Sequence, residues 1–210
     1  MRVMPMWALV PVRALAEGKK RLAPLMSPEE RAVLAKTMLE DVLDCLGRAP
    51  AIEGIAVVTD DPTAAALALD YRALVLPDAP PCDKTRGGLN ASLEGAAAWL
   101  RATRAEATML IMHADLPAAC PEDIAALAAV EAVARSARAN PPDVVLARAH
   151  DGGTNALKLR PGVLLPFAFG ADSCARHFAA ARAAGLSVAV LERAALALDL
   201  DRPEDVAAYL

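Results

Sequence analysis

The stretch WALVPVRALAEGKKR, residues 7–21, shows the pattern on which the fold prediction depends. Residues 7–12 form a near-continuous apolar run, which is typical of a strand buried on both faces. A loop follows at once and carries the basic side chains Arg13, Lys19, Lys20 and Arg21. A buried strand that ends in a polar loop is the usual beginning of a strand–loop–helix unit in α/β proteins.

The same unit recurs along the chain. Ser27, Pro28 and Glu30 form a capping box that predicts a helix from there to about Leu46. Further strands are predicted at residues 54–61, 72–77, 109–117, 143–150, 154–161, 186–192 and 196–201. Further helices are predicted at residues 61–70, 89–104, 121–138, 174–184 and 203–210.

This alternation predicts an α/β fold with a mostly parallel sheet, built as one domain over residues 1–210. The turn sequence DGG, residues 151–153, adds one antiparallel hairpin. Most of the unusual polar residues follow the ends of predicted strands. We therefore expect them to share one crevice at the carboxyl edge of the sheet, where such folds bind ligands.

Composition narrows the function classes. The formal net charge of −4 argues against nucleic acid as the main partner. No run approaches the roughly 18 apolar residues of a membrane span, so no membrane role is expected. Four well-separated cysteines indicate reduced thiols in the cytoplasm, with neither a zinc site nor a disulfide framework. A homodimer is the default expectation for the assembly.

Three aspartates suggest a cation site. In the predicted strand 196–201, Asp199 and Asp201 fall on one face, where their charges repel unless something positive lies between them. Asp115 stands just past another apolar strand. Three carboxylates would suit Mg²⁺ or Mn²⁺. The alternatives are that Asp115 caps a turn and that Asp201 caps the last helix while Asp199 is solvated.

The basic loop is a candidate for binding a triphosphate, or else an ordinary solvated surface. Its single glycine, Gly18, fits neither a dinucleotide fingerprint nor a P-loop. In GGLN, residues 87–90, Gly88 allows close backbone approach, and Asn90 could read a base edge or cap a helix.

Two more polar turns could bind phosphate. Thr154 lies in DGGTN, residues 151–155, and Ser173 ends FGADS, residues 169–173, at a predicted helix N-terminus. Each could also be an ordinary turn. The three histidines are not spaced as metal ligands or as part of a catalytic triad, and His113 is expected to have a hydrogen-bonded structural role.

Taken in order, these stretches resemble the 2-phospho-L-lactate guanylyltransferase family. This family acts in the biosynthesis of coenzyme F-420 and is related to the molybdenum-cofactor guanylyltransferases. The resemblance extends from Trp7 to Leu210 and is carried by residues 7–24, 27–39, 57–61, 87–93, 114–117, 151–157, 169–177 and 196–206.

The resemblance implies a three-layer α/β/α, Rossmann-like nucleotide-diphospho-sugar transferase fold. It also implies that GTP and a phosphorylated acid react to give a guanosine diphospho-acid and pyrophosphate. The acid would be 2-phospho-L-lactate, phosphoenolpyruvate or 3-phosphoglycerate.

The resemblance also assigns residue roles. Magnesium would be held by Asp115, Asp199 and Asp201, which with Lys19 form the catalytic set. The phosphate of the acid would be held by Thr154, Gly170 and Ser173. The triphosphate would face Arg13, Lys19 and Arg21, and the nucleoside Gly88 and Asn90.

The chain departs from the family pattern at Lys20, at the shortened DGGTN turn, at Ala171 and Asp172, and at Lys84 and Arg86. These departures leave the choice of acid open. One alternative is another magnesium-dependent nucleotidyltransferase that acts on a sugar phosphate or a molybdopterin. The others are a glycosyltransferase with an Asp-x-Asp metal motif and a non-catalytic nucleotide-binding module.

Overall fold

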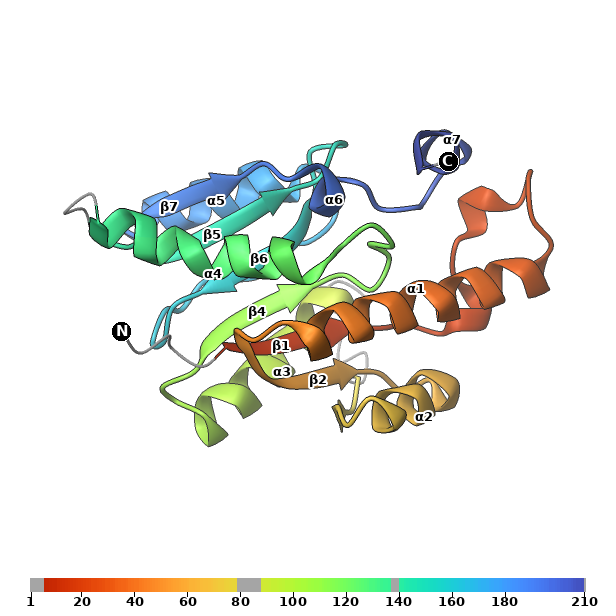
Figure 1. The fold of residues 1–210 in the computed structure, drawn as a ribbon, viewed down its shortest axis with the longest axis horizontal. Helices are drawn as coiled ribbons and strands as arrows, with labels where there is room; N and C mark the ends of the chain where they lie inside the picture. The colour runs from red at the N-terminus through yellow and green to blue at the C-terminus, as the bar shows by residue number, and fades with distance from the viewer. Residues whose placement is uncertain (1–5, 79–87, 137–139, 210) are drawn as a thin grey trace.

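The computed structural model describes residues 6–78, 88–136 and 140–209, which contain one seven-stranded mixed sheet between helices (Figure 1). Its strands are β1 Met6–Pro11, β2 Ile52–Val58, β3 Leu74–Leu76, β4 Thr108–Met112, β5 Val144–Arg148, β6 Thr154–Leu159 and β7 Val188–Leu191. Its helices are α1 Pro28–Arg48, α2 Pro62–Asp70, α3 Leu89–Thr103, α4 Pro121–Ser136, α5 Ser173–Ala183, α6 Ala194–Ala197 and α7 Pro203–Tyr209, with short 3-10 helices η1 Leu15–Glu17 and η2 Lys20–Leu22.

One strand runs against the others. The strand order is β3-β2-β1-β4-β6-β5-β7, and β6 is antiparallel to both of its neighbours while the remaining pairs are parallel. This confirms the predicted hairpin between β5 and β6. Because β6 is reversed, its first residues, Thr154 and Asn155, lie where the parallel strands end. There the backbone N–H of His113, directly after β4, donates to the carbonyl of Asn155 at 3.0 Å.

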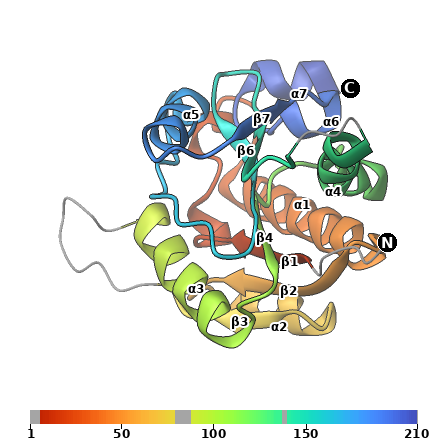
Figure 2. The same ribbon diagram turned by 90° about the vertical axis from the view of Figure 1, so that its left-hand side faces the viewer.

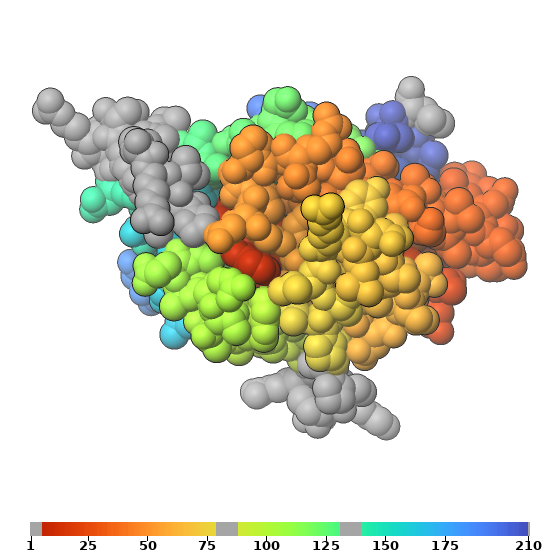
Figure 3. All heavy atoms as spheres, turned by 60° about the horizontal axis from the view of Figure 1, so that its bottom comes forward, coloured from red at the N-terminus to blue at the C-terminus, as the bar shows by residue number. Residues whose placement is uncertain are grey.

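Helices cover both faces of the sheet. On one face α1 and α4 bury Leu43 and Ile124 in one hydrophobic cluster, and on the other α3 and α5 bury Leu93 and Ala181 in a second cluster. Figure 2 shows α1 and α4 on one side of the sheet and α3 and α5 on the opposite side. From the underside, α1, α2 and α3 leave little of β1 at the surface (Figure 3). The three-layer α/β/α prediction is confirmed.

The start of α1 forms as its sequence predicts. The Ser27 hydroxyl accepts from the Glu30 N–H at 3.2 Å, and the Glu30 carboxylate accepts from the Ser27 N–H at 2.7 Å. This box fixes the end of the basic loop, so the loop is anchored by β1 on one side and by α1 on the other. Over the described ranges, no helix is long and apolar enough to cross a membrane.

The strand predicted at residues 196–201 is wrong. Residues 194–197 form the single-turn helix α6, and residues 198–202 have no regular secondary structure. Leu196 is fully buried in the core, and the backbone N–H of Leu200 donates to the carbonyl of Asp115 at 3.3 Å. The segment therefore lies across the carboxyl edge of the sheet, and tertiary contacts outweigh the alternating pattern of its sequence.

Gly54 of β2 makes room for the indole of Trp7, and this close contact gives a stability test. A Cβ at Gly54 would lie 2.5 Å from Cζ2 of Trp7, whereas a Cβ at Gly95, in α3, would meet nothing within 4 Å. We expect Gly54→Ala to lower the free energy of unfolding by about 1–3 kcal/mol through overpacking. The matched control, Gly95→Ala, should raise it by roughly 0.5–1 kcal/mol, because alanine favours the helix. Urea denaturation measures both, and an unchanged or more stable Gly54→Ala protein would contradict this packing.

Candidate active site

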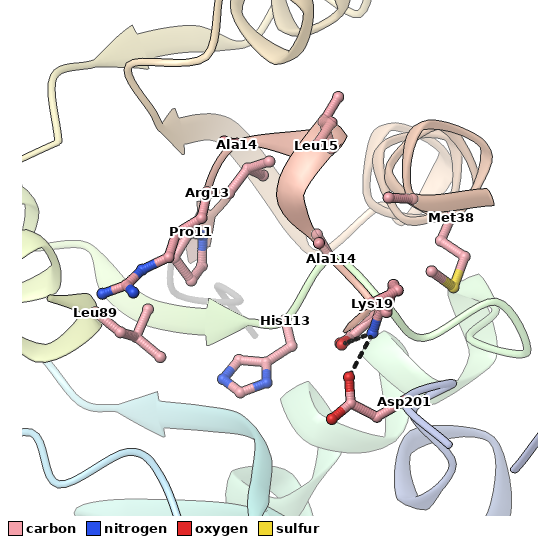
Figure 4. A pocket seen from close by; sticks show the side chains of 14 residues that line it. Pro11, Arg13, Ala14, Leu15, Lys19, Met38, Leu89, His113, Ala114 and Asp201 are labelled. Atoms are coloured by element: carbon pink, nitrogen blue, oxygen red, sulfur yellow. Dashed lines mark hydrogen bonds and ion pairs between the residues drawn. The ribbon is translucent and has the colours of Figure 1, made fainter. Parts of the chain in front are cut away.

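Two hollows adjoin at the carboxyl edge of the sheet. The first, of about 350 Å³, is lined by the loop after β1, the loop after β4 and Asp201 (Figure 4). The second, of about 640 Å³, continues along the basic loop to Asp60, Asp61 and Asp78. Arg13 and Gly18 line both hollows, so the basic loop forms a common wall.

Lys19 lies between two of the predicted metal ligands. Its Nζ is 2.5 Å from Oδ2 of Asp115 and 3.2 Å from Oδ1 of Asp201. Arg21 reaches the other oxygen of Asp201 at 2.7 Å. Burial alone would lower the pKa of Lys19, but the two carboxylates outweigh it and hold the pKa above its ordinary value. The positive charge that the aspartates require is thus supplied by the protein itself.

Lys19 is held in this position by its backbone. Its φ of 52° places it in the left-handed region, which non-glycine residues seldom adopt. It stands at the N-cap of η2, where its carbonyl accepts from the N–H of Leu22 at 2.9 Å. Only 9% of its side chain is exposed. The loop therefore aims Lys19 inward, while the side chain of Lys20, 75% exposed, points out toward Glu17 at 4.0 Å.

Asp115 has one satisfied oxygen and one unsatisfied oxygen. Oδ2 binds Lys19, but Oδ1 is buried and has no hydrogen-bond partner among the described residues. Burial works to raise the pKa of Asp115, and the charges of Lys19 and His113 overcome this effect, so the pKa lies below its ordinary value. Asp115 is therefore an ionised carboxylate with an oxygen free to bind a ligand.

Asp199 lies beside this pair but has different neighbours. Its Oδ1 accepts from Nδ2 of Asn155 at 3.1 Å and lies 3.9 Å from Nδ1 of His150. Burial is the main reason that the pKa of Asp199 is raised, and the charge of Asp115 adds to this effect. The Asp205 carboxylate fixes the following turn by accepting from the backbone N–H of Asp201 at 2.9 Å.

Within the described ranges, no group of three or more His, Cys, Asp or Glu residues is arranged to hold a metal ion. Asp115 and Asp201 share a cation, Lys19, and Asp199 is near enough for the Asp115 charge to affect its pKa. The structure thus joins Asp115 to Asp201 through Lys19 and leaves Asp199 nearby with other contacts, and joint binding of a metal by the three remains a prediction.

The residues predicted to hold the acid form a second cluster. Thr154 and Ser173 are each 1% exposed, with 3.2 Å between their hydroxyl oxygens. Gly170 has a φ of 120°, which favours glycine, and its carbonyl accepts from the N–H of Ser173 at 3.1 Å. Asp172, one of the departures from the family pattern, is left-handed with a φ of 52°, which aspartate tolerates better than most residues.

The residues predicted to face the nucleotide are only partly brought together. Arg13 packs on Gly88, where an added Cβ would lie 2.6 Å from its Nη2, and the φ of 119° at Gly88 is one that favours glycine. Asn90 instead binds the backbone of Phe169, accepting from its N–H at 2.8 Å and donating to its carbonyl at 3.2 Å. Its contact with a nucleoside remains a prediction. Lys84 and Arg86 lie outside the described residues.

Sequence reasoning missed three residues of this region. Asn155 orients Asp199, His177 bonds to Thr154, and His150 lies 3.1 Å from Asp205. Only Asn155 had a usable signal, because it adjoins Thr154 in the DGGTN turn. His113 also differs from expectation, because its ring lines the first hollow and its buried Nε2 has no partner in the described structure.

Low pH should lower the free energy of unfolding through protonation of His177. Burial, followed by the charge of Arg176, lowers the pKa of His177 to about 4 from 6.5. A lowered pKa means that His177 favours folding above pH 6.5 and that this contribution is lost as the pH falls toward 4. Urea denaturation at pH 7 and pH 4 should therefore show a larger loss of stability for the wild type than for His177→Asn, which cannot protonate. Equal losses would contradict this assignment.

Comparison with known proteins places the chain in a defined group. Residues 6–210 match the family described as guanylyl transferase CofC like. A 3-phospho-D-glycerate guanylyltransferase of Phenylobacterium zucineum is 40% identical over 201 residues, which cover 94% of this chain and 86% of the relative. A phosphoenolpyruvate guanylyltransferase of Sphaerobacter thermophilus is 38% identical over 200 residues, covering 95% and 89% of the two chains.

A solved structure supports the fold. A Desulfovibrio desulfuricans protein, provisionally described as a nucleotide-diphospho-sugar transferase, superposes with a TM-score of 0.70 at 17% identity. The match covers 89% of this chain and 79% of that protein. Together with the three layers and the mixed sheet, this confirms the predicted Rossmann-like fold of the nucleotide-diphospho-sugar transferases.

Proposed function

The chain belongs to the CofC-like guanylyl transferase family, and we propose that it joins GTP to a small phosphorylated acid, releasing pyrophosphate. The product is a guanosine diphospho-acid, as required for coenzyme F-420 biosynthesis. The family match and relatives named as guanylyltransferases support this proposal.

The observation that carries the proposal is the cluster around Lys19. A buried cation joins two carboxylates next to a hollow of about 350 Å³, and one carboxylate oxygen there has no partner. Charge held in such a position is suited to polyphosphate chemistry, in which positioning and charge neutralisation supply most of the catalysis. If these loops were ordinary solvated surface, their charged side chains would be expected to lie in water and not in a buried cluster.

The donors in this cluster fit Mg²⁺, with Mn²⁺ as its substitute. All are carboxylate oxygens, which both ions prefer, and we assign them to Asp115, Asp199 and Asp201. The unpartnered Oδ1 of Asp115 and the raised pKa of Asp199 mark places where added positive charge would stabilise the site. Neutralising the two anionic substrates is the chemistry that the bound ion supplies.

The proposed reaction needs no protein nucleophile. A phosphate oxygen of the acid attacks the α-phosphorus of GTP, the bond from that phosphorus to the β-phosphate oxygen breaks, and pyrophosphate leaves. No general base is required, because the phosphate of the acid is already ionised. In this scheme Arg13, Lys19 and Arg21 hold the triphosphate, Gly88 and Asn90 face the nucleoside, and Thr154, Gly170 and Ser173 hold the acid.

The proposal also covers the domain organisation of the protein, its location, its assembly and its acid substrate. The chain acts as one domain over residues 1–210, in the cytoplasm, and a homodimer is the expected assembly. The acid is one of 2-phospho-L-lactate, phosphoenolpyruvate and 3-phosphoglycerate. The two relatives described above are named for the last two of these acids, so all three are compared directly.

Pyrophosphate release tests the reaction. Wild-type protein with GTP and Mg²⁺ should release pyrophosphate with at least one of the three acids. Asp199→Asn should lower kcat by about 100-fold or more, the effect of removing one electrostatic contact to a transition state. Its melting temperature should not fall, because burial makes the Asp199 charge unfavourable. Asp44→Asn is the matched control, since Asp44 pairs with Arg48 at 3.2 Å on the exposed face of α1, away from the site.

Each contrary result points to another function. Release only with a sugar phosphate or a molybdopterin would identify a different nucleotidyltransferase. GTP binding without release from any acceptor would indicate a nucleotide-binding module. Normal turnover by Asp199→Asn would show that Asp199 is not one of the metal ligands.

Metal binding gives a test that does not depend on turnover. Electron paramagnetic resonance of Mn²⁺ without nucleotide should show weaker binding to Asp115→Asn than to the wild type. Lys19→Gln should bind Mn²⁺ at least about tenfold more tightly, because it removes the ammonium that pairs with Asp115 and Asp201 and repels the ion. Tenfold corresponds to about 1.4 kcal/mol, less than the roughly 4 kcal/mol between unit charges 4 Å apart near a protein surface. Lys20→Gln, changed at an exposed position, should bind as the wild type does. Unchanged Mn²⁺ affinity in both the Asp115 and the Lys19 variants would rule out a cation site at this cluster.

A further inference from the structure

A buried chain of hydrogen bonds joins the loop before α5 to the start of β6. The backbone N–H of Ala168 donates to Nε2 of His177 at 2.9 Å. Nδ1 of His177 lies 3.1 Å from Oγ1 of Thr154, which lies 3.2 Å from Oγ of Ser173. The three side chains are at most 1% exposed. The chain thus ends at the two hydroxyls assigned to the acid.

The backbone donor decides which ring nitrogen carries the proton. A peptide N–H can only donate, so Nε2 of His177 must present its lone pair to Ala168. In a neutral ring the hydrogen is then on Nδ1, and it is donated to Thr154. The lowered pKa of His177, about 4, keeps the ring in this neutral form at ordinary pH.

This tautomer leaves one hydroxyl hydrogen of the Thr154 and Ser173 pair available to a ligand. Thr154 accepts from His177, so its own hydroxyl hydrogen is not needed for that contact. Thr154 and Ser173 bring two hydroxyl hydrogens, and the contact between them uses one. One hydrogen remains, and neither hydroxyl has a further acceptor among the residues described by the structure. In the opposite tautomer Nδ1 would accept from the Thr154 hydroxyl, and no hydroxyl hydrogen would be left for a ligand.

The ring of His177 has little freedom to turn. Phe169 packs against it edge to face, with 4.8 Å between ring centroids. Asn90 in turn holds the backbone of Phe169 by two hydrogen bonds. The orientation of the ring is therefore imposed from the loop and from α3.

We propose that His177 is a positioning residue for the acid, directing a hydroxyl hydrogen of Thr154 or Ser173 toward the acid's phosphate. This inference rests on the proposed function and extends it to a residue that touches neither substrate. A phosphate presents only acceptors, so a hydroxyl pair fixed as a donor recognises it, while the imidazole adds no charge.

A matched pair of variants separates positioning from stability. In His177→Asn the amide replaces Nδ1 and can still donate to Thr154, but it loses the contact with Ala168. In His177→Gln the amide reaches the place of Nε2 and keeps the contact with Ala168, but it loses Thr154. Each variant removes one buried hydrogen bond, so we expect similar losses of melting temperature.

The kinetic constants should differ between the two variants. His177→Gln should raise KM for the acid roughly tenfold, the effect expected for a misdirected hydrogen bond to an ionised group. KM for GTP should change less than about twofold, and His177→Asn should keep KM for the acid within about threefold of the wild type. Equal rises of KM for the acid in both variants, or equal rises for both substrates, would overturn the positioning role.

Binding of inorganic phosphate, followed by calorimetry, keeps this test distinct from that of the proposed function. If no acid supports pyrophosphate release, the proposed reaction fails. Positioning of an anion still holds if the wild type and His177→Asn bind phosphate and His177→Gln binds it at least about tenfold more weakly. Equal phosphate binding by all three proteins, or none by any, would overturn the inference.

Discussion

The ion pairs of Lys19 join three segments of the chain that form the candidate active site. Lys19 reaches carboxylates that lie 96 and 182 positions further along the chain, and it does so from a left-handed backbone. Without a cation there, Asp115 and Asp201 would be partly buried charges of the same sign next to Asp199. The loop after β1, the loop after β4 and the segment before α7 are thus held by one electrostatic requirement, and each of them lines the first hollow.

The reversed strand β6 makes the second half of the site. Had β6 been parallel, Thr154 and Asn155 would lie at the opposite edge of the sheet, far from the aspartates. Its reversal brings Asn155 to Asp199 at 3.1 Å and Thr154 to the start of α5. One antiparallel strand in an otherwise parallel sheet therefore brings the residues proposed to hold the acid to the same edge of the sheet as the three aspartates.

Local signals in the sequence predicted local structure well. The capping box of Ser27 and Glu30, the hairpin around residues 151–153 and the strands that became β1 to β7 follow from short-range chemistry and are confirmed. The segment 196–201 shows the limit, because an alternating pattern also suits a chain that crosses the edge of a sheet. The partners of Lys19 and His177 could not be predicted, since they depend on side chains that meet only once the sheet has formed.

In the proposed reaction, Asp115, Asp199 and Asp201 would hold a metal ion, and Lys19 would hold the triphosphate instead of pairing with Asp115 and Asp201. A crystal structure of the protein with Mn²⁺ and a non-hydrolysable GTP analogue tests it most directly. Anomalous density for Mn²⁺ is expected at Asp115, Asp199 and Asp201, with Lys19 moved onto the triphosphate. Mn²⁺ bound elsewhere, or Lys19 still joining Asp115 and Asp201 beside a bound nucleotide, would contradict it.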